Sequence, residues 1–275
     1  MKIPISVVIF TRNEESNIRE CIYSASEFSE TVVIDSESSD RTVEITMELG
    51  ARLVPFKWNG EYPKKRQWSL ENVTYKNEFI LFLDADERIP PALCDELRFF
   101  IARNADNFSA GSISIDYYFA GKRLKYGQRP KKIVLLRIGK AKFPQIDDLR
   151  ASGMGELEGH YQPIINGRTK TFSHRIVHND NDPISSWMNR HVNYAEWEAH
   201  LLANPEVKRQ VDRSKGGLVS FFHKLPFRPL VFFVYSYFFK FGFLDGKPGF
   251  DYAFAKSWYY WLSRVMAREM PLEIE

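Results

Sequence analysis

Two carboxylates one residue apart, Asp84 and Asp86, are the residues of this chain whose types and spacing most directly suggest chemistry. They follow an uninterrupted apolar run over residues 79–83, which is typical of a strand buried on both faces of a parallel sheet. Open α/β sheets bind their ligands beyond the carboxyl ends of such strands. Because Mg²⁺ and Mn²⁺ prefer carboxylate and phosphate oxygens, the pair predicts a divalent-cation site. In the alternative interpretation, it is an acidic strand end before a helix that Pro90 and Pro91 open.

Polar groups also stand at the ends of two other apolar runs. The run over residues 5–10 leads into the sequence TRNEE, and the run over residues 31–34 ends at Asp35. Carboxyl ends of parallel strands meet at one edge of a sheet, so we expect these groups to lie near the carboxylate pair. Alternatively, Asn13 caps the following helix and Glu15 lies in its first turn.

Three adjacent cations, Lys64, Lys65 and Arg66, follow a proline that can open a helix. Cations oppose the dipole at the start of a helix, and this placement therefore favours an anion such as a diphosphate as their partner. The alternative is a solvated basic turn, because charge runs usually lie on the surface.

Candidates for a general base lie in the glycine-rich sequence GMGELEGHYQP. Glu156, Glu158 and His160 alternate there, so an extended segment would place all three on one face. Carboxylates and an imidazole gathered in this way can take a proton from a substrate hydroxyl. An exposed strand edge would show the same pattern.

A cluster of metal-ligand types follows, and it raises the question of a zinc site. The residues are His178, Asp180, Asp182 and His191. Their spacing matches no closed zinc site, and metal ligation by His178 stays an open alternative. We expect residues 187–201 to belong to a packed helix.

Apolar runs alternate with helical periodicities along the first hundred residues, which predicts an α/β fold with right-handed crossovers. The formal net charge of +3 provides no field for nucleic-acid binding. Cys21 and Cys94 fall in predicted helices with apolar neighbours, and we expect buried free thiols in a reducing compartment. The opening sequence MKIPISVVIF has no signal-peptide pattern, which favours the cytoplasmic side.

The last quarter of the chain is crowded with aromatic residues, most densely over residues 221–244. Its uninterrupted apolar piece, residues 229–239, is shorter than the roughly 20 residues that cross a bilayer. Because cations flank this piece, we predict a helix that lies in the interface of an anionic membrane. The alternatives are an aromatic core helix and a homo-oligomer contact through residues 221–270.

Taken in order, the sequences TRNEE, VVIDSESSDRT and FLDADE resemble the nucleotide-sugar-binding half of a family 2 glycosyltransferase with the GT-A fold. The resemblance extends to KKRQ and to FLDGKPG, and it is closest to the branch that includes lipopolysaccharide core β-glucosyltransferases. It implies a Rossmann-like, mostly parallel sheet flanked by helices over residues 1–208. Its nucleotide-sugar half is residues 1–104 and its acceptor half is residues 105–208. A helical extension would follow over residues 209–275.

The resemblance also assigns site residues by position. Those implied to bind the nucleotide sugar, expected to be UDP-linked, are Thr11, Arg12, Asn13, Glu15, Asp35, Lys65, Arg66, Asp84 and Ala85. Asp86 would hold Mg²⁺ or Mn²⁺ together with Asp84, and it counts among the catalytic residues. For the base, relatives present an acidic pair or a His-Glu pair. This chain departs from that pattern, and we favour Glu158 over Glu156.

The implied activity is the inverting transfer of a sugar to a hydroxyl of a glycan or glycolipid in cell-envelope polysaccharide or lipopolysaccharide synthesis. The enzyme would act peripherally at the inner face of the plasma membrane. One alternative is a nucleotidyltransferase, although TRNEE lacks the glycine of the loop that usually follows the first strand in that class. The other is a nucleotide-binding scaffold at the membrane surface without catalysis.

Overall fold

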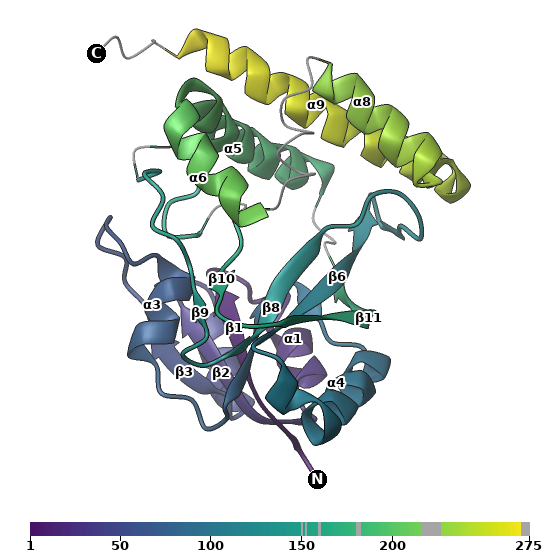
Figure 1. The fold of residues 1–275 in the computed structure, drawn as a ribbon. Coiled ribbons are helices and arrows are strands. Elements are labelled where there is room, and N and C mark those ends of the chain that lie inside the picture. Colours follow the sequence, from purple (N-terminus) through teal and green to yellow (C-terminus); the bar gives the residue numbers. More distant parts are fainter. Residues whose placement is uncertain (150, 152, 159–160, 180–182, 216–226, 271–275) are drawn as a thin grey trace.

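The computed structural model describes residues 1–149, 151, 153–158, 161–179, 183–215 and 227–270. Within these residues, nine strands form one sheet in the order β3-β2-β1-β4-β8-β6-β11-β5, with β7 paired to β6 (Figure 1). Their bounds are β1 Ile3–Thr11, β2 Phe28–Asp35, β3 Arg52–Pro55, β4 Phe79–Asp84, β5 Glu87–Arg88, β6 Ala110–Phe119, β7 Lys122–Arg123, β8 Lys131–Arg137 and β11 Thr169–His178. A separate two-stranded sheet pairs β9 (Ala141–Lys142) with β10 (Ile164–Ile165).

The strand directions confirm the predicted mostly parallel sheet. β1 is parallel to β2 and to β4, and β2 is parallel to β3. β8 is antiparallel to both β4 and β6, whereas β6 and β11 are parallel. Therefore β3, β2, β1, β4, β6 and β11 all run in one direction, and their carboxyl ends lie along one edge.

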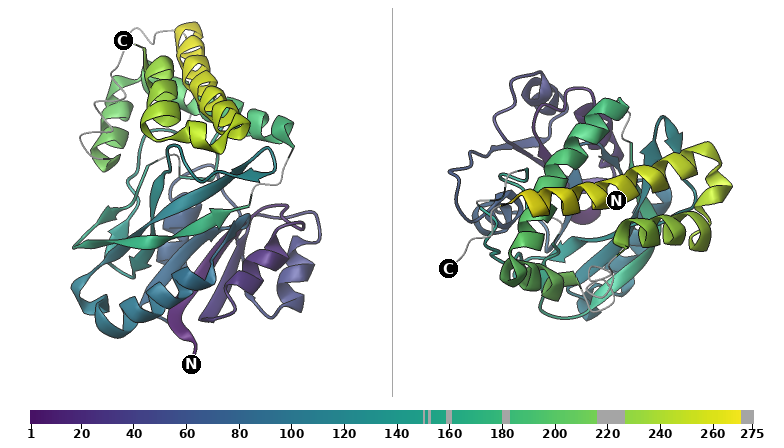
Figure 2. Two further views of the ribbon diagram at one scale, coloured as in Figure 1. Left: turned by 90° about the vertical axis from the view of Figure 1, so that its right-hand side faces the viewer. Right: turned by 90° about the horizontal axis from the view of Figure 1, so that it is seen from above.

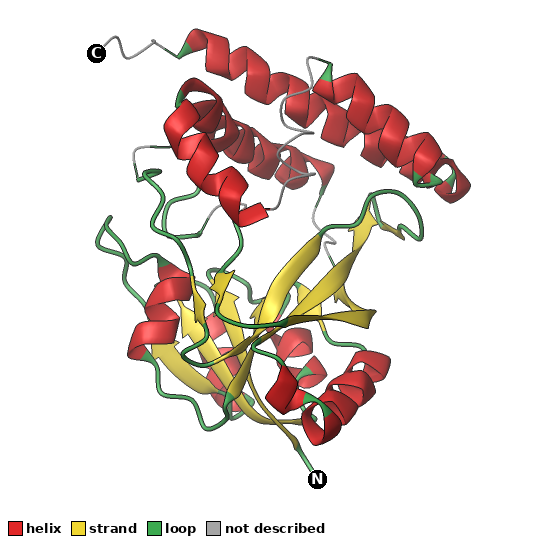
Figure 3. Ribbon diagram, viewed as in Figure 1, coloured by secondary structure: helices red, strands yellow, loops and turns green. Residues whose placement is uncertain are grey.

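Helices flank this sheet, as expected for the fold (Figure 3). Their bounds are α1 Ile18–Ser24, α2 Thr42–Glu48, α3 Lys65–Asn72, α4 Pro91–Arg103, α5 Ile184–Ala203, α6 Pro205–Lys215, α8 Arg228–Val234 and α9 Lys247–Glu269, with shorter turns η1 Ala105–Asn107, η2 Tyr235–Phe239 and η3 Gly242–Asp245. Pro91 opens α4, as its sequence position predicts. The start of α1 is a correction: the helix begins at Ile18, and Asn13 and Glu15 lie in the preceding loop.

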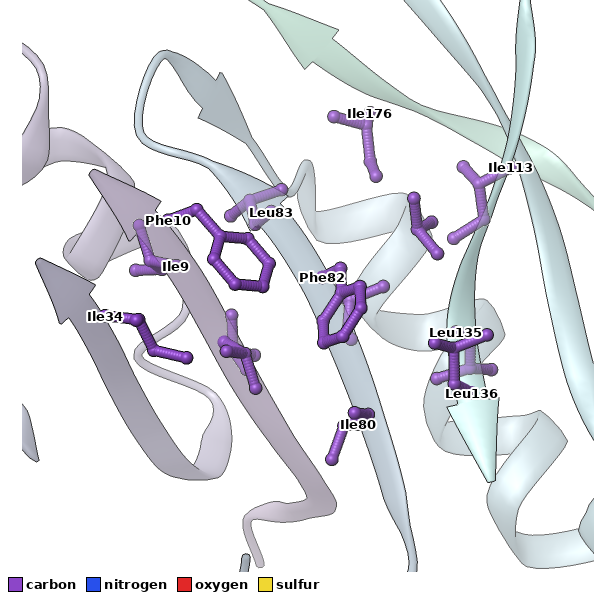
Figure 4. Packing of buried hydrophobic residues seen from close by; sticks show 14 of the residues in the cluster. Ile9, Phe10, Ile34, Ile80, Phe82, Leu83, Ile113, Leu135, Leu136 and Ile176 are labelled. Atoms are coloured by element: carbon purple, nitrogen blue, oxygen red, sulfur yellow. The ribbon is translucent and has the colours of Figure 1, made fainter. Parts of the chain in front are cut away.

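The core lies along the central strands, whose apolar side chains are buried on both faces of the sheet. Ile9 and Phe10 of β1 lie beside Phe82 and Leu83 of β4 (Figure 4). The rings of Phe10 and Phe82 meet edge to face with 4.9 Å between centroids. Burial of each such side chain contributes about 1.5–3 kcal/mol relative to exposure. This packing fixes the register that aligns the polar strand ends. The thiols of Cys21 and Cys94 are buried and unbridged, as predicted.

A layer of helices α5, α6, α8 and α9 covers the sheet at the end opposite the N-terminus (Figure 2). The boundary predicted at residue 209 falls within α6, and α5 packs against α9. The helical layer therefore begins at Ile184. No helix in the described part of the chain has the length and apolar character needed to cross a membrane.

Candidate functional site

The parallel register brings the predicted polar strand ends together. Thr11 at the end of β1 is paired with Asp35 at the end of β2. On the other side of β1, Phe10 is paired with Asp84 at the end of β4. Three of the predicted site residues thus occupy adjacent strand ends, and the loops that follow them surround one region.

The loops after β1 and β2 are bound to each other by hydrogen bonds. Asn13, at a φ of +56°, accepts from the backbone N–H of Ser39 at 2.8 Å. Glu15 accepts from the backbone N–H of Arg41 at 3.0 Å. This geometry replaces the helix-capping interpretation of Asn13 and Glu15, because both side chains bind the loop after β2 and α1 begins only at Ile18. Arg12 is exposed in the same loop.

Asp35 is buried at the end of β2, and its carboxylate accepts from the backbone N–H of Ser38 at 2.9 Å and from the Ser38 hydroxyl. Next to it, the hydroxyl of Ser36 donates to Glu156. The short serine-rich loop therefore links the end of β2 to the segment that carries the base candidates.

The three adjacent cations have separate partners within the folded chain, and their predicted contact with an anion such as a diphosphate stays a prediction. Lys64 Nζ lies 2.9 Å from Asp148 Oδ1, and both side chains are buried. Lys65 is also buried, and its ammonium donates to the carbonyl of Thr11 at 2.9 Å and lies 3.4 Å from Glu156 Oε1. Burial lowers the pKa of Lys65. Arg66 is the cation of the three that reaches the carboxylate pair.

Both oxygens of Asp84 are bound by cations. Arg66 donates to Oδ1 at 2.8 Å, and Lys132 from β8 donates to Oδ2 at 3.0 Å. Burial acts to raise the pKa of Asp84, but Lys132 and Arg66 outweigh it and hold that pKa well below its usual range. Lys132 also lies 3.0 Å from Glu87 Oε1. Lys132 was not among the predicted site residues, although the basic stretch at residues 128–132 was a signal for it.

Asp86 has a different environment. Its Oδ2 lies 3.2 Å from Nε2 of His178, while its Oδ1 is buried without a hydrogen-bond partner. The short strand β5 produces this contact, because it pairs with the end of β11 and sets His178 opposite Glu87. Burial acts to lower the pKa of His178, but the Asp86 carboxylate outweighs it and raises that pKa to about 9. Ala85, between the two aspartates, is buried.

These surroundings test whether the predicted metal ligands fit a divalent cation. The unpartnered Oδ1 of Asp86 is an oxygen donor suited to Mn²⁺ or Mg²⁺ when substrate phosphates complete the shell. The adjacent imidazole of His178 can add a nitrogen donor after it loses its proton, although Mg²⁺ favours oxygen ligands. Asp84 fits poorly, because both of its oxygens are occupied by cations. The described residues contain no group of three or more His, Cys, Asp or Glu that could hold a metal by themselves. Asp86 with His178 is therefore the pair that fits.

The base candidates differ sharply in their surroundings. Glu158 is buried and accepts from the backbone N–H groups of Arg66 at 3.1 Å and Gln67 at 2.8 Å, so it caps the start of α3. Burial raises its pKa. Glu156 instead lies at the end of β2, where it contacts Ser36 and Lys65. Residues 153–157 form a turn followed by a bend, so this part of the segment is not extended as expected.

The segment considered for zinc separates into two environments. His191 belongs to α5, where its ring stacks on Trp187 with 3.5 Å between centroids, as expected for a packed helix. His178 contacts Asp86 at the sheet edge. His160, Asp180 and Asp182 lie outside the described residues.

Comparisons with known proteins find glycosyltransferases among the similar sequences. An uncharacterized glycosyltransferase of Rickettsia bellii is 38% identical over 113 residues, which cover 40% of this chain and 37% of that protein. The lipopolysaccharide core biosynthesis glycosyltransferase LpsC of Rhizobium meliloti is 29% identical over 153 residues, which cover 52% of this chain and 54% of LpsC. The chain thus spans less than two thirds of either relative.

Among solved structures, glucosyl-3-phosphoglycerate synthase of Mycobacterium tuberculosis, in complex with Mn²⁺, UDP and glucosyl-3-phosphoglycerate, is similar with a TM-score of 0.33. It has 26% identity over 42% of this chain and 44% of that chain. The sequence model of Glycosyl transferase family 2 matches residues 6–151, more than half of the chain. This match includes the strand ends that carry Asp35, Asp84 and Asp86, and the chain therefore belongs to glycosyl transferase family 2.

Proposed function

We propose that this protein transfers a sugar, with inversion, from a UDP-linked donor to a hydroxyl of a glycan or glycolipid acceptor of the cell envelope. The observation that carries the proposal is the convergence of Asp35, Asp84 and Asp86 with Arg66 and Lys132 at adjacent strand ends. A UDP-linked donor requires carboxylates that bind its nucleobase, its ribose and a metal ion. It also requires cations that bind its diphosphate. The relationship to LpsC supports an acceptor in lipopolysaccharide core synthesis.

The donor is expected to lie across the ends of β1, β2 and β4. The loop after β1, which carries Arg12, Asn13 and Glu15 and is hydrogen-bonded to the loop after β2, borders the nucleoside. Asp35 accepts a hydrogen bond from the uracil ring. Arg66 and Lys132 bind the diphosphate through N–H groups that do not contact Asp84, so their contacts to that carboxylate are kept. Lys65 positions Glu156 and Thr11 and makes no donor contact of its own.

A divalent cation on Asp86 and His178 would supply additional positive charge for the leaving diphosphate. The chain's own part is to orient these ligands. His178 has to lose the proton that Asp86 holds on it before its Nε2 can bind a metal. Asp84 stays with its cations and the ribose.

We assign the base to Glu156 in place of Glu158. Glu158 uses both oxygens to cap α3 and is buried, so it cannot receive a proton from an acceptor without uncapping that helix. The Glu156 side chain is 16% exposed and is oriented by Ser36 and Lys65. It takes the acceptor proton while the acceptor oxygen bonds to the sugar carbon and the bond from that carbon to the diphosphate breaks.

The buried free thiols Cys21 and Cys94 support a reducing compartment, and we place the enzyme on the cytoplasmic side. The first experiment is a thermal-shift screen with UDP, GDP, CMP and dTDP, each with and without Mn²⁺. Ligand at about 100 times its Kd stabilises the native state by about 2.7 kcal/mol, so a UDP-specific shift of several degrees is expected. Asp35→Asn should lose the shift, and the exposed control Asp95→Asn should retain it.

Absence of a shift with every nucleotide would refute the donor site. A shift with UDP-sugars but no hydrolysis of the donor at any metal concentration would support the non-catalytic scaffold instead. A preference for nucleoside triphosphates would support the nucleotidyltransferase.

A further inference from the structure

A cluster of exposed aromatic side chains lies where the hairpin of α8 and α9 turns. Within residues 238–244, the exposed apolar residues are Phe238, Phe239, Phe241, Phe243 and Leu244. Phe239 is 71% exposed and Phe241 is 55% exposed. Monomeric proteins rarely expose contiguous apolar surface of this kind unless it binds a partner or a membrane.

The backbone of this turn is closely packed and hydrogen-bonded. Phe241 has a φ of +59°, and Gly242 is packed so closely that an added Cβ would lie 2.8 Å from the carbonyl of Ser236. Backbone hydrogen bonds close successive turns at Lys240, Phe241 and Leu244. The aromatic rings are therefore held outward by a tightly packed backbone. Because folding has already ordered this turn, binding through it loses little further backbone entropy.

A second segment, remote in sequence, is fastened to the same turn. Asp245 accepts from the backbone N–H groups of Lys125 at 3.0 Å and Tyr126 at 2.8 Å. Gly127 donates to the carbonyl of Lys240 at 2.9 Å. Figure 1 shows this loop, after β6, rising to the end of the α8–α9 hairpin. We call residues 238–244 and 122–126 together the aromatic tip.

The charge of this region is predominantly positive. Lys122, Lys125, Lys240 and Lys247 are all exposed on or beside the aromatic tip. The acid nearest to them in sequence, Asp245, is occupied by backbone N–H groups. Aromatic rings surrounded by lysines match the interface of an anionic bilayer, where rings lie at headgroup depth and each cation contributes roughly 1 kcal/mol.

A second copy of this chain is a poorer occupant. In a two-fold dimer the same patch faces itself, so the lysines of each copy would confront those of the other. We propose that the aromatic tip docks this protein onto an anionic lipid bilayer.

The position of the aromatic tip adds a consequence that rests on the proposed function. Tyr126 precedes Lys132 by six residues, so the two Cα atoms lie at most about 22 Å apart. Lys132 contacts Asp84 at the donor site. A docked tip therefore places the donor site within reach of an acceptor whose lipid is embedded in the same bilayer.

Cosedimentation of the full chain with vesicles tests the docking. One set contains phosphatidylcholine alone, and the other contains phosphatidylcholine mixed with phosphatidylglycerol, an anionic lipid that gives the vesicle surface a negative potential. Wild-type protein should partition at least about tenfold better into the anionic vesicles, with binding that weakens as salt is raised. The triple variant Phe238→Ser, Phe239→Ser, Phe241→Asn should lose binding, since it removes exposed rings and keeps a residue that tolerates the positive φ of position 241.

Two control variants separate the aromatic tip from general surface effects. Tyr23→Ser with Phe99→Ser removes exposed rings elsewhere and should bind normally. Replacing Lys122, Lys125, Lys240 and Lys247 by Gln should abolish the preference for anionic vesicles, whereas the same change at Lys57, Lys76, Lys140 and Lys142 should preserve it.

Equal loss in the control variants, or no vesicle binding by wild type, would overturn the proposal. So would a concentration-dependent dimer in analytical ultracentrifugation that the tip variant abolishes without any vesicle binding. The UDP-dependent thermal shift is measured on the same variants. Its retention in the tip variant shows that a docking failure is independent of the donor site, and its absence in wild type would count against the proposed function alone.

Discussion

Lys132 of β8 lies opposite Asp84 of β4, with its Nζ 3.0 Å from Asp84 Oδ2. The antiparallel register that pairs Leu81 with Leu135 leads to this contact when it is continued by three residues. The cation that contacts the carboxylate pair thus comes from β8, about 50 residues further along the chain. Electrostatic attraction holds it at the place where a donor diphosphate is expected.

Replacing Lys132 should weaken nucleotide binding. A charge-assisted hydrogen bond contributes about 1.5–3 kcal/mol, so Lys132→Met should raise the Kd for UDP by about 10- to 100-fold. Isothermal titration calorimetry measures this change. Lys131→Met, at an exposed neighbouring position, is the matched control and should bind as wild type does. An unchanged Kd in Lys132→Met would remove Lys132 from the donor site.

Glu156 and Glu158 should respond differently to the same conservative change. Glu156→Gln should lower kcat by about 10²- to 10⁴-fold without changing the Kd for the donor, because it removes the proton acceptor. Glu158→Gln should instead lower the free energy of unfolding by about 1–2 kcal/mol, because it weakens the cap of α3. Steady-state kinetics and urea titration on both variants decide the assignment. A kcat defect confined to Glu158→Gln would restore the sequence-based choice.

The sequence predicted the polar strand ends because their positions depend on local pattern and on one sheet register. Asp35, Asp84 and Asp86 each follow an apolar run, and parallel pairing brings such ends together. Lys132 and His178 depend on how β8 and β11 pair with distant strands, which no local periodicity specifies. The alternation of Glu156 and Glu158 likewise does not indicate that Glu158 caps α3, a helix about 90 residues earlier in the chain.

Asp86 and His178 should be needed for metal-dependent stabilisation. In wild type, Mn²⁺ together with UDP should raise the Tm more than UDP alone, since ligand binding to the native state stabilises it by mass action. Asp86→Asn and His178→Gln should each abolish this increment while UDP alone still binds. Asp84→Asn should keep part of the increment, because its oxygens are bound by Arg66 and Lys132. If the Asp84 variant alone lost the increment, the metal would belong to Asp84.

Without metal, the contact between His178 and Asp86 should make stability depend on pH. The pKa of His178 is about 9 in the folded protein and near 6.5 in the unfolded chain. The folded state binds the proton more tightly, so this contribution is complete below about pH 6.5 and is lost as pH rises through about 9. Its size is on the order of 3 kcal/mol. Urea titrations in EDTA at pH 6, 7.5 and 9.5 should show wild type and His178→Gln converging at high pH, and a constant difference between them would contradict this account.

The buried pair of Lys64 and Asp148 should be a strong determinant of stability. Asp148 also accepts from the indole N–H of Trp197 at 3.0 Å and from the hydroxyl of Tyr62, so it joins α5 to the loop before α3. Asp148→Asn leaves the ammonium of Lys64 buried without a counter-charge, which typically costs about 3–5 kcal/mol. The double variant Lys64→Met, Asp148→Asn should recover part of that loss in urea titration, because no buried charge remains. Glu44→Gln, at an exposed pair with Arg41, should leave the urea midpoint nearly unchanged. Equal midpoints for Asp148→Asn and wild type would contradict the assignment of this pair as a determinant of stability.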